Sequence, residues 1–523
     1  MPNWLHNRTI RRDLLAIAFI GLLVQGYWAL RMTHPSYFDA YYYTDNAQRL
    51  ADGHGFTQEF IWQYLDAPDE IPLPSFTYWM PLPAMIGALG YWLGGTFRAA
   101  QVPFWLMAGL LPWLGYAISW RLTANRRQAW TAALFTAAGG YYSSYFSQPT
   151  TFALFAWTGG GCLLALAWAQ ERPQQLGYWL LAGLAAGLSH LARADGMLLL
   201  LLGGWVWLLA LRDGGLAQWR RHGLNGLLFV LGYLLVMGGW FWRTYQLTGT
   251  PLSTVGTQTI FLTTYNDVFS YGRFFDLHSY LAWGWGNILR SKWDALLLAA
   301  QTFLGVTGLT VFTFFFVWAW WRYGRKAGTG RFLRPFTWYT IGLYAAMTFV
   351  FTFPGQRGSL LHSSTALWPW SMALAVAGVD MTVDAIARRR PNWQPAQAKR
   401  LFAAVFTAMV FLVSFVVSGG HPLRDDEVVI FEQIAAAVPA DAVVMLGSPP
   451  SFYYHTGVRS IVVPNEPPEV LLQIAQRYGA EYLVLNDDRP PILADLLDGN
   501  VVLPQIQEIG RFGESYVLYE LVR

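Results

Sequence analysis

The 523-residue chain has few charged residues and a single cysteine. Asp, Glu, Lys and Arg make up 13% of the sequence, about half of the roughly 25% that is typical of soluble domains. The chain also has 54% hydrophobic residues and 27 tryptophans, and this composition excludes a disordered chain, a nucleic-acid binder and an ordinary cytosolic enzyme. Cys162 lies within an apolar run, so the sequence predicts no internal disulfide and no cysteine metal site.

Several common catalytic motifs are also missing. The chain contains no nucleotide-type glycine loop, no HExxH motif and no CxxC motif, and its nine histidines are scattered. A nucleotide site and a transition-metal site are therefore not expected. We expect no cofactor, and the sequence leaves the question of a divalent cation open.

Long apolar runs are abundant. A bilayer core of about 30 Å needs about 20 apolar residues per helix, and most of the runs approach this length. The first run follows Arg8, Arg11 and Arg12 without a cleavage site after it, so we interpret it as an uncleaved span. We predict an α-helical polytopic membrane protein with about eleven transmembrane helices, at residues 14–30, 102–120, 128–147, 151–170, 176–191, 197–211, 224–241, 295–321, 336–353, 365–387 and 401–418.

The distribution of basic residues predicts the orientation of these spans. With the N-terminus in the cytoplasm, alternate connections collect most of the arginines and lysines, as the positive-inside rule requires. The short apolar run 80–95 begins with Pro81 and Pro83, and if it crossed the membrane the later basic loops would lie outside. We therefore predict an interfacial or re-entrant helix there and place the C-terminus outside.

This topology divides the chain into two domains. Residues 1–419 form a predicted transmembrane domain with two large outer loops, 31–101 and 242–294, and residues 420–523 form an extracytoplasmic tail. Strand and helix patterns alternate in the tail, which predicts a small α/β domain. The expected strands are 442–447, 460–463, 482–486 and C-terminal strands, and the expected helices are 427–438, 468–478 and about 491–498. The segment Gly447–His455 follows a strand end, where ligands often bind, although a structural loop is the simpler interpretation.

Ionisable residues beside the outer ends of the spans are functional candidates. Residues 40–52 are expected to form a helix that Gly53 ends, and Asp39 precedes this helix as a possible N-cap. Asp45 lies about 120° from Asp39 around the helix axis, so the two carboxylates form no evident pair. We interpret Asp45, with Arg49 and Asp52 on the same face, as part of a solvated, salt-bridged surface.

Three arginines follow the outer ends of different spans. Arg193, Arg243 and Arg357 could converge on one anionic group, and a lipid phosphate is the natural ligand at that depth because arginine binds phosphate through bidentate hydrogen bonds. His362 follows the third arginine. The alternatives are an interfacial arginine paired with Asp195, a structural turn around Arg243, and a polar connector around Arg357.

Taken in order, these segments resemble the C-type glycosyltransferase (GT-C) superfamily, and more narrowly the bacterial dolichyl-phosphate-mannose mannosyltransferase and aminoarabinose-transferase branch. The resemblance covers roughly residues 10–390. Two positions depart from the usual pattern, because Ala40 follows Asp39 where many members have Glu, and Ala194 replaces a proline. The matching motifs are Asp39–Phe56 after the first span, Tyr78-Trp79-Met80-Pro81-Leu82, Leu191–Gly196, and Arg243 with Thr248-Gly249-Thr250-Pro251.

The resemblance implies an inverting glycosyltransferase that takes a sugar from a polyprenyl phosphate on the extracytoplasmic face of the bacterial plasma membrane. Asp39 would be the general base on the acceptor hydroxyl, and the acceptor could be a glycan, a lipid or a protein. Donor phosphate or sugar contacts are expected from the three arginines, His362 and the aromatic residues, with Asp45 and Asp195 as supporting residues. The aromatic candidates, which could equally be interfacial belt residues, are Tyr42, Tyr43, Tyr78 and Trp79.

Two other functional classes remain open at this point. A transporter or flippase of a lipid-linked sugar would need ionisable groups in mid-span and paired broken helices. A non-catalytic membrane scaffold would act through its outer tail as a binding module. No nucleic acid partner is expected in any of the three cases.

Overall fold

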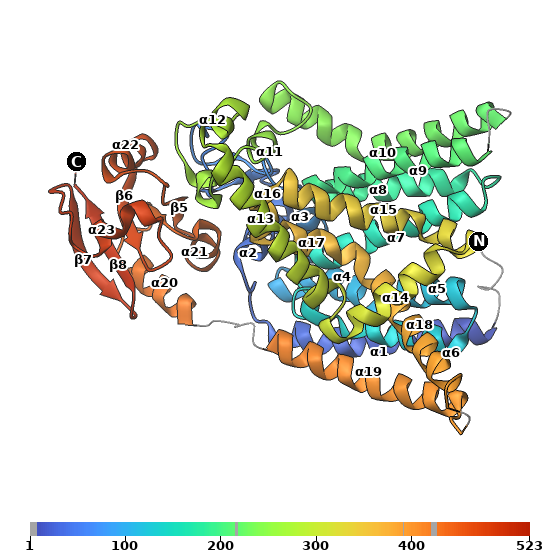
Figure 1. Ribbon diagram of the computed structural model, residues 1–523. Coiled ribbons are helices and arrows are strands. Elements are labelled where there is room, and N and C mark those ends of the chain that lie inside the picture. Colours follow the sequence, from blue (N-terminus) through green and yellow to red (C-terminus); the bar gives the residue numbers. More distant parts are fainter. Residues whose placement is uncertain (1–7, 215–217, 391, 420–425, 523) are drawn as a thin grey trace.

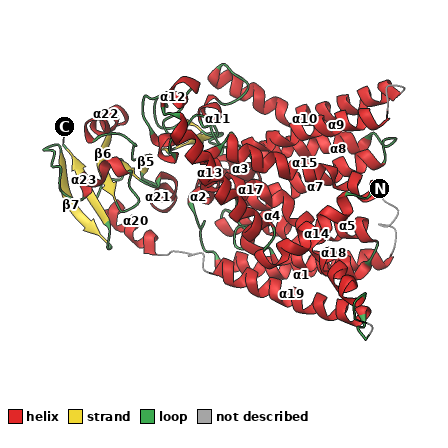
Figure 2. Ribbon diagram, viewed as in Figure 1, coloured by secondary structure: helices red, strands yellow, loops and turns green. Residues whose placement is uncertain are grey.

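A computed structural model describes residues 8–214, 218–390, 392–419 and 426–522. Most of these residues belong to a bundle of helices, and a small sheet lies beyond one end of it (Figures 1 and 2). The helix α2 (Phe38–Ala51) and the short helices α11 (Thr254–Gln258) and α12 (Leu277–Ala282), which come from the two long loops, lie between the bundle and the sheet.

Among the residues that the structure describes, seven helical stretches are long and apolar enough to cross a membrane. They correspond to seven of the predicted spans, and the chain is a multi-pass helical membrane protein. The stretches are α1 (Arg8–Arg31), α4 with α5 (Phe97–Leu110 and Pro112–Thr123), α7 (Thr151–Glu171), η3 with α9 (Ala194–Gly196 and Met197–Gly214), α10 (Trp219–Thr248), α16 to α18 (Thr352 to Ala387) and α19 (Pro395–Gly419).

The predicted span 295–321 is not one straight helix. The helix α13 (Trp285–Thr302) and its extension to Thr307 meet η7 (Thr310–Phe312) and α14 (Thr313–Gly324) at 92°, and counting this bent pair as one span brings the total to eight. Leu309 and Thr310 adopt positive φ angles of 48° at the break, a conformation that a continuous α-helix cannot contain.

Three other predicted spans are not among the stretches that are long and apolar enough to cross a membrane in the described part of the chain, so the expected total of eleven is not confirmed. The run 128–147 contains α6 (Arg126–Ala138), which stops where Gly139 and Gly140 take positive φ angles, and then η2 (Gly140–Tyr142). The run 176–191 matches the 16-residue helix α8 (Gly177–Ala192), and the run 336–353 overlaps α15 (Ala327–Phe349), which begins earlier and ends four residues sooner. The short apolar run 80–95 forms the 13-residue α3 (Leu82–Gly94).

The tail folds into the predicted alternation of strands and helices. Its helices are α20 (Asp426–Ala436), α21 (Pro449–Thr456), α22 (Pro468–Tyr478) and α23 (Ala494–Leu497), and its strands are β4 (Val443–Leu446), β5 (Arg459–Val462), β6 (Ala480–Leu485), β7 (Ile506–Phe512) and β8 (Tyr516–Leu521). Strands β4, β5 and β6 are parallel, and β8 pairs antiparallel with β6 and β7.

The sheet also contains a strand from the first long loop. That loop has three two-residue strands, β1 (Thr57–Gln58), β2 (Phe60–Ile61) and β3 (Leu73–Pro74). Strand β2 pairs in parallel with β5, so the sheet order is β2-β5-β4-β6-β8-β7. The tail therefore completes its sheet with residues that lie directly after α2.

Further polar contacts fasten the tail to the first loop. Glu59 accepts a contact from Arg49 at 3.1 Å and another from Arg459 at 3.0 Å. The hydroxyl of Tyr64 donates to the carbonyl of Val462 at 2.5 Å, and that of Tyr478 donates to the carbonyl of Pro68 at 2.7 Å. These bonds join loop and tail on both sides of the shared strand.

The segment Gly447–His455, interpreted above as a loop, forms most of helix α21. Pro449 and Pro450 occupy its first turn, where proline fits because no backbone donor is needed. The helix packs against α2, and the Tyr41 hydroxyl lies 3.0 Å from Nε2 of His455 and 2.9 Å from Nδ1 of His34.

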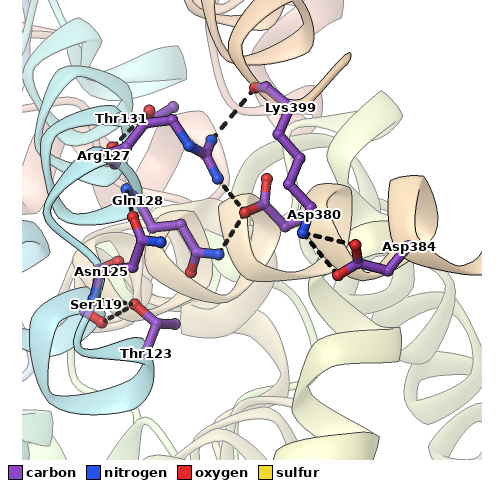
Figure 3. Close-up of polar contacts among 9 residues, drawn as sticks. All are labelled: Ser119, Thr123, Asn125, Arg127, Gln128, Thr131, Asp380, Asp384 and Lys399. Atoms are coloured by element: carbon purple, nitrogen blue, oxygen red, sulfur yellow. Dashed lines mark hydrogen bonds and ion pairs between the residues drawn. The ribbon is translucent and has the colours of Figure 1, made fainter. Parts of the chain in front are cut away.

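At the far end of the bundle, a buried carboxylate ties three helices together (Figure 3). Asp380 of α18 (Trp368–Ala387) accepts hydrogen bonds from Arg127 and Gln128 of α6. Arg127 also donates to the carbonyl of Lys399 in α19 at 3.3 Å, and the Lys399 ammonium lies 2.6 Å from Asp384. A buried charge that is paired in this way avoids most of its desolvation cost.

Candidate active site

Asp39 lies in the first turn of α2 and not before it. Tyr37 is the N-cap, with an extended backbone, and the helix begins at Phe38. The expectation that Asp39 caps the helix is therefore wrong, because the chain turns helical immediately after Tyr37. The predicted end of the helix is confirmed, since Asp52 is the C-cap and Gly53 follows at a φ of 84°.

The carboxyl group of Asp39 is mostly enclosed and lies near an imidazole. Its side chain is 24% exposed, and Oδ2 is 3.6 Å from Nε2 of His362. Burial raises the pKa of Asp39 from its ordinary 3.8 to about 6, and the guanidinium of Arg193 partly opposes that shift. Such a carboxyl group changes protonation state close to neutral pH, which suits a general base.

The ring of His362 is held firmly in place. Its Nδ1 is 2.5 Å from the hydroxyl of Thr151, and the ring stacks on Phe152 with 3.9 Å between centroids. If the Thr151 hydroxyl donates to Nδ1, the neutral ring carries its proton on Nε2, the atom that faces Asp39. The Nε2 proton is then on the side of Asp39, at a distance slightly longer than a hydrogen bond.

Arg193 lies at a break between two helices. It follows the end of α8 in an extended conformation, and the turn η3 begins at the next residue. A Cβ on Gly196 would lie 2.3 Å from the backbone of Ser189, so this turn needs glycine. The break turns the arginine side chain into the protein interior.

The guanidinium of Arg193 is anchored by a carboxylate. Its Nε donates to Asp195 at 3.1 Å, and Asp195 also accepts a hydrogen bond from the hydroxyl of Ser363. The side chain of Arg193 is 12% exposed, so the arginine does not extend to the surface. The pairing with Asp195 that the sequence suggested is present.

Arg243 occupies a different environment. Its guanidinium donates to the carbonyl of Ser75 at 2.9 Å and to that of Phe56 at 3.4 Å. It also lies over the rings of Trp240 and Phe56, 4.5 Å and 5.1 Å from their centroids. Through these contacts, Arg243 holds the first loop against α10.

Arg357 is an exposed side chain in the π-helical turn η8 (Gly355–Ser359). Its guanidinium lies over the ring of Tyr265, 4.6 Å from the centroid, and Tyr265 belongs to η5 (Tyr265–Phe269) in the second loop. Burial and the charge of Asp39 raise the pKa of Tyr265 to about 12, and Arg357 opposes the shift. Sequence reasoning did not identify Tyr265, because its loop carries no recognisable motif.

Aromatic side chains form one wall of the site. Trp79 stacks on Trp62 with 4.3 Å between centroids and meets Tyr42 edge-on at 4.5 Å. Tyr43 lies nearly parallel to Trp79 at 5.9 Å, and Tyr78 contacts Trp62 at 5.3 Å. The predicted aromatic residues therefore lie together, with Trp62 as a member that the sequence did not reveal.

A cavity of about 240 Å³ adjoins these groups. Its walls come from α2, the segment 76–80, the α8–α9 junction, the end of α10 and the second loop. Tyr43, one helical turn beyond Asp39, lines it. The other predicted residues in the lining are Tyr78, Trp79, Arg193 and Asp195.

Asp45 does not belong to a solvated face. The residue is 4% exposed, and Arg49 pairs with Glu59 instead. The helices α3 and α21 pack on α2, and burial raises the pKa of Asp45 well above its ordinary value. The solvated interpretation is therefore wrong, because α3 and the tail helix α21 pack on α2 and leave Asp45 buried.

Within residues 8–214, 218–390, 392–419 and 426–522, there is no group of three or more His, Cys, Asp or Glu side chains that could hold a metal ion. The chemistry that these side chains offer is a carboxyl group with a pKa near neutrality, a fixed imidazole and a buried arginine beside an aromatic cavity.

Comparison with known proteins identifies the fold. No protein-family model and no curated protein sequence matches the chain. Among solved structures, the archaeal oligosaccharyltransferase AglB from Archaeoglobus fulgidus, in complex with an inhibitory peptide and a dolichol-phosphate, has a TM-score of 0.61 and 12% identity, over 92% of this chain and 70% of that one. ArnT from Cupriavidus metallidurans, bound to undecaprenyl phosphate, has a TM-score of 0.57 and 16% identity, over 97% of both chains.

These likenesses establish the fold of the chain. The chain has the fold of the GT-C glycosyltransferases, and the resemblance that the sequence motifs suggested is confirmed at this level. The similarity to ArnT extends over the tail as well as the helical bundle, since almost the whole length of each chain is covered.

Proposed function

We propose that the chain is an inverting glycosyltransferase that moves a sugar from a polyprenyl-phosphate donor to an acceptor hydroxyl. The observation that carries this proposal is Asp39, a partly enclosed carboxyl group with a pKa of about 6, close to a buried arginine that lines a cavity. The structures of similar fold were solved with dolichol-phosphate and with undecaprenyl phosphate, which supports a lipid-linked donor.

In the proposed reaction, the oxygen of the acceptor hydroxyl attacks the anomeric carbon of the donor sugar, and Asp39 accepts the proton of that hydroxyl. The bond from that carbon to the phosphate oxygen breaks, and the configuration inverts. Negative charge then develops on the leaving phosphate, and Arg193 and Arg357 are the cations proposed to stabilise it. The aromatic wall around Trp79 covers the apolar face of the sugar.

His362 is proposed to orient the base. A proton on Nε2 would face one oxygen of the Asp39 carboxylate. The other oxygen would then be available to accept the proton of the acceptor hydroxyl. Asp195 plays the equivalent part for Arg193, because its contacts fix the guanidinium on the side of the cavity. We place this site on the extracytoplasmic face of a bacterial plasma membrane, in keeping with the distribution of basic residues.

The test is transfer from a synthetic polyprenyl-phosphate sugar by the purified full-length protein and its Asp39→Asn variant. General acid–base catalysis is typically worth 10²–10⁴-fold, so the variant should lose at least about 100-fold in turnover. Asp52→Asn is the matched control, because Asp52 is exposed at the other end of the same helix. Unchanged turnover in Asp39→Asn excludes the assigned base, and donor that crosses the membrane without being consumed identifies a transporter.

A further inference from the structure

A second cavity of about 140 Å³ lies at the opposite end of the helices that hold the active site. Thr151 at the start of α7 contacts His362, whereas Gln170 near the end of α7 lines this second cavity. The rise of 1.5 Å per residue separates the two by about 28 Å. The cavity is formed by the ends of α7 and α9 and the beginnings of α8, α10 and α15.

The wall of this cavity carries a concentration of buried polar atoms without partners. Within the described part of the chain, five such atoms belong to four of its lining residues. All four residues are more than nine-tenths buried, with 1% to 6% of their surface exposed. Buried polar groups are nearly always hydrogen-bonded in proteins, so this concentration indicates a missing partner. The atoms are Gln170 Nε2, Trp179 Nε1, His222 Nδ1, His222 Nε2 and Asn225 Oδ1.

The size of the cavity excludes a single bound water as the partner. A cavity needs roughly 10–15 Å³ on the same measure to hold one water molecule, and this one offers about 140 Å³. The space fits a group of several heavy atoms. It also opens beside polar side chains on five helices, so that a bound group could be contacted from several directions.

The chemistry of the wall favours an anion. The amide of Gln170 is oriented by Arg334, whose Nη1 donates to Gln170 Oε1 at 3.3 Å, so the Gln170 Nε2 donor is left for the cavity. Trp179 adds a donor, and a neutral His222 adds one donor and one acceptor. Donors therefore outnumber acceptors among the unpartnered atoms.

Two arginines in the lining add positive charge. Arg334 is held by Asp213, to which its Nη1 donates at 2.6 Å, and Arg331 lies exposed three residues earlier in α15. With one carboxylate against two guanidinium groups, the lining is net positive. Basic pockets between transmembrane helices are a known setting for anionic lipid head groups.

We propose that this cavity binds a phosphate group. Its oxygens would accept hydrogen bonds from Gln170, Trp179, His222 and the arginines, and a neighbouring hydroxyl on the ligand would donate to Asn225. The phosphate can belong to an anionic phospholipid head group or to a free phosphorylated compound, and both present the same tetrahedral oxyanion. This site is separate from the proposed transfer site, and neither depends on the other.

The first experiment measures binding of inorganic phosphate to the delipidated full-length protein by its effect on thermal unfolding, with chloride at equal ionic strength as the reference. Saturable stabilisation is expected. His222→Phe removes two ring nitrogens, and Arg331→Gln removes an exposed charge; each should weaken binding at least about tenfold. Arg220→Gln, which removes an exposed charge outside the lining, should bind as the parent does.

The second experiment distinguishes the source of the phosphate. Native mass spectrometry compares retention of phosphatidylglycerol and phosphatidylcholine by the same variants. Preferential retention of phosphatidylglycerol that His222→Phe and Arg331→Gln abolish identifies a lipid head group, and phosphate binding without lipid preference identifies a free ligand. The proposal is overturned if neither probe binds, if both variants bind as the parent does, or if a density map shows only water in the cavity. Because Arg331 is exposed, Arg331→Gln remains informative if His222→Phe fails to fold.

Discussion

Replacing Asp39 with asparagine should stabilise the protein at neutral pH while it removes the proposed base. The folded state raises the pKa of Asp39 from 3.8 to about 6, so it binds this proton more tightly than the unfolded chain does. The free energy of unfolding therefore falls as pH rises from below 4 to above 6. A shift of about two units corresponds to about 3 kcal/mol, and Asp39→Asn should recover up to that amount at pH 7.5.

The assay is thermal unfolding of parent and variant in the same detergent, followed by tryptophan fluorescence at pH 7.5 and at pH 4.5. The variant should have the higher Tm at pH 7.5, and the difference should shrink at pH 4.5, where most of the parent's Asp39 is already protonated. Asp52→Asn controls for the loss of a carboxylate elsewhere on α2. Equal stability of parent and Asp39→Asn at both pH values would refute the reasoning, because it would mean that the site does not disfavour the charged carboxylate.

The same ionisation should govern catalysis. Only the carboxylate form of Asp39 can accept a proton, so kcat/KM of the parent should fall about tenfold per pH unit below pH 6. The stabilising effect of asparagine and the acid limb of the activity profile should therefore occur in the same pH range. An acid limb well below pH 5 would separate the general base from Asp39.

Three further substitutions test particular contacts. Arg193→Gln should lower transfer about 10²-fold or more, and it should also lower Tm because it leaves the buried Asp195 carboxylate without its cation. Arg243→Gln should lower Tm with a much smaller loss of turnover, because Arg243 holds loop carbonyls. Steady-state kinetics separate the two, and a larger loss of turnover in Arg243→Gln would contradict the assignment. Glu59→Gln should destabilise the protein by about 1–3 kcal/mol, because it weakens the contacts with Arg49 and Arg459. Chemical denaturation measures the effect, and an unchanged midpoint would show that these contacts contribute nothing.

Local sequence patterns were sufficient to predict several helices and strands. Helix α2 and its end at Gly53 follow from helical periodicity and a glycine stop signal, and the tail strands follow from short apolar segments between turns. The order of motifs around Asp39 and Arg193 was enough to predict the GT-C fold. In each case the signal lies within a few neighbouring residues.

Other features depend on contacts between distant segments. Asp45 is buried where α2 packs against α3 and against α21, and α21 lies some 400 residues later in the chain. No proline lies at the break at Leu309 and Thr310, so this common sequence signal for a helix break is missing there. Tyr265 and Trp62 lie at the site because of the way the two long loops pack. These loops have no hydrophobic periodicity from which their packing could be predicted.

The shared strand has a consequence for the order of biosynthesis. Phe60 and Ile61 pair with Ser460 and Ile461, so the loop that carries Asp39 cannot adopt its final arrangement until β5, some 400 residues later, has been made. A nascent protein that has inserted all of its helices would still lack the partner that fixes α2. Under the proposed function, a chain that ends before β5 would carry Asp39 on a first loop without its partner strand, and we expect no sugar transfer from it.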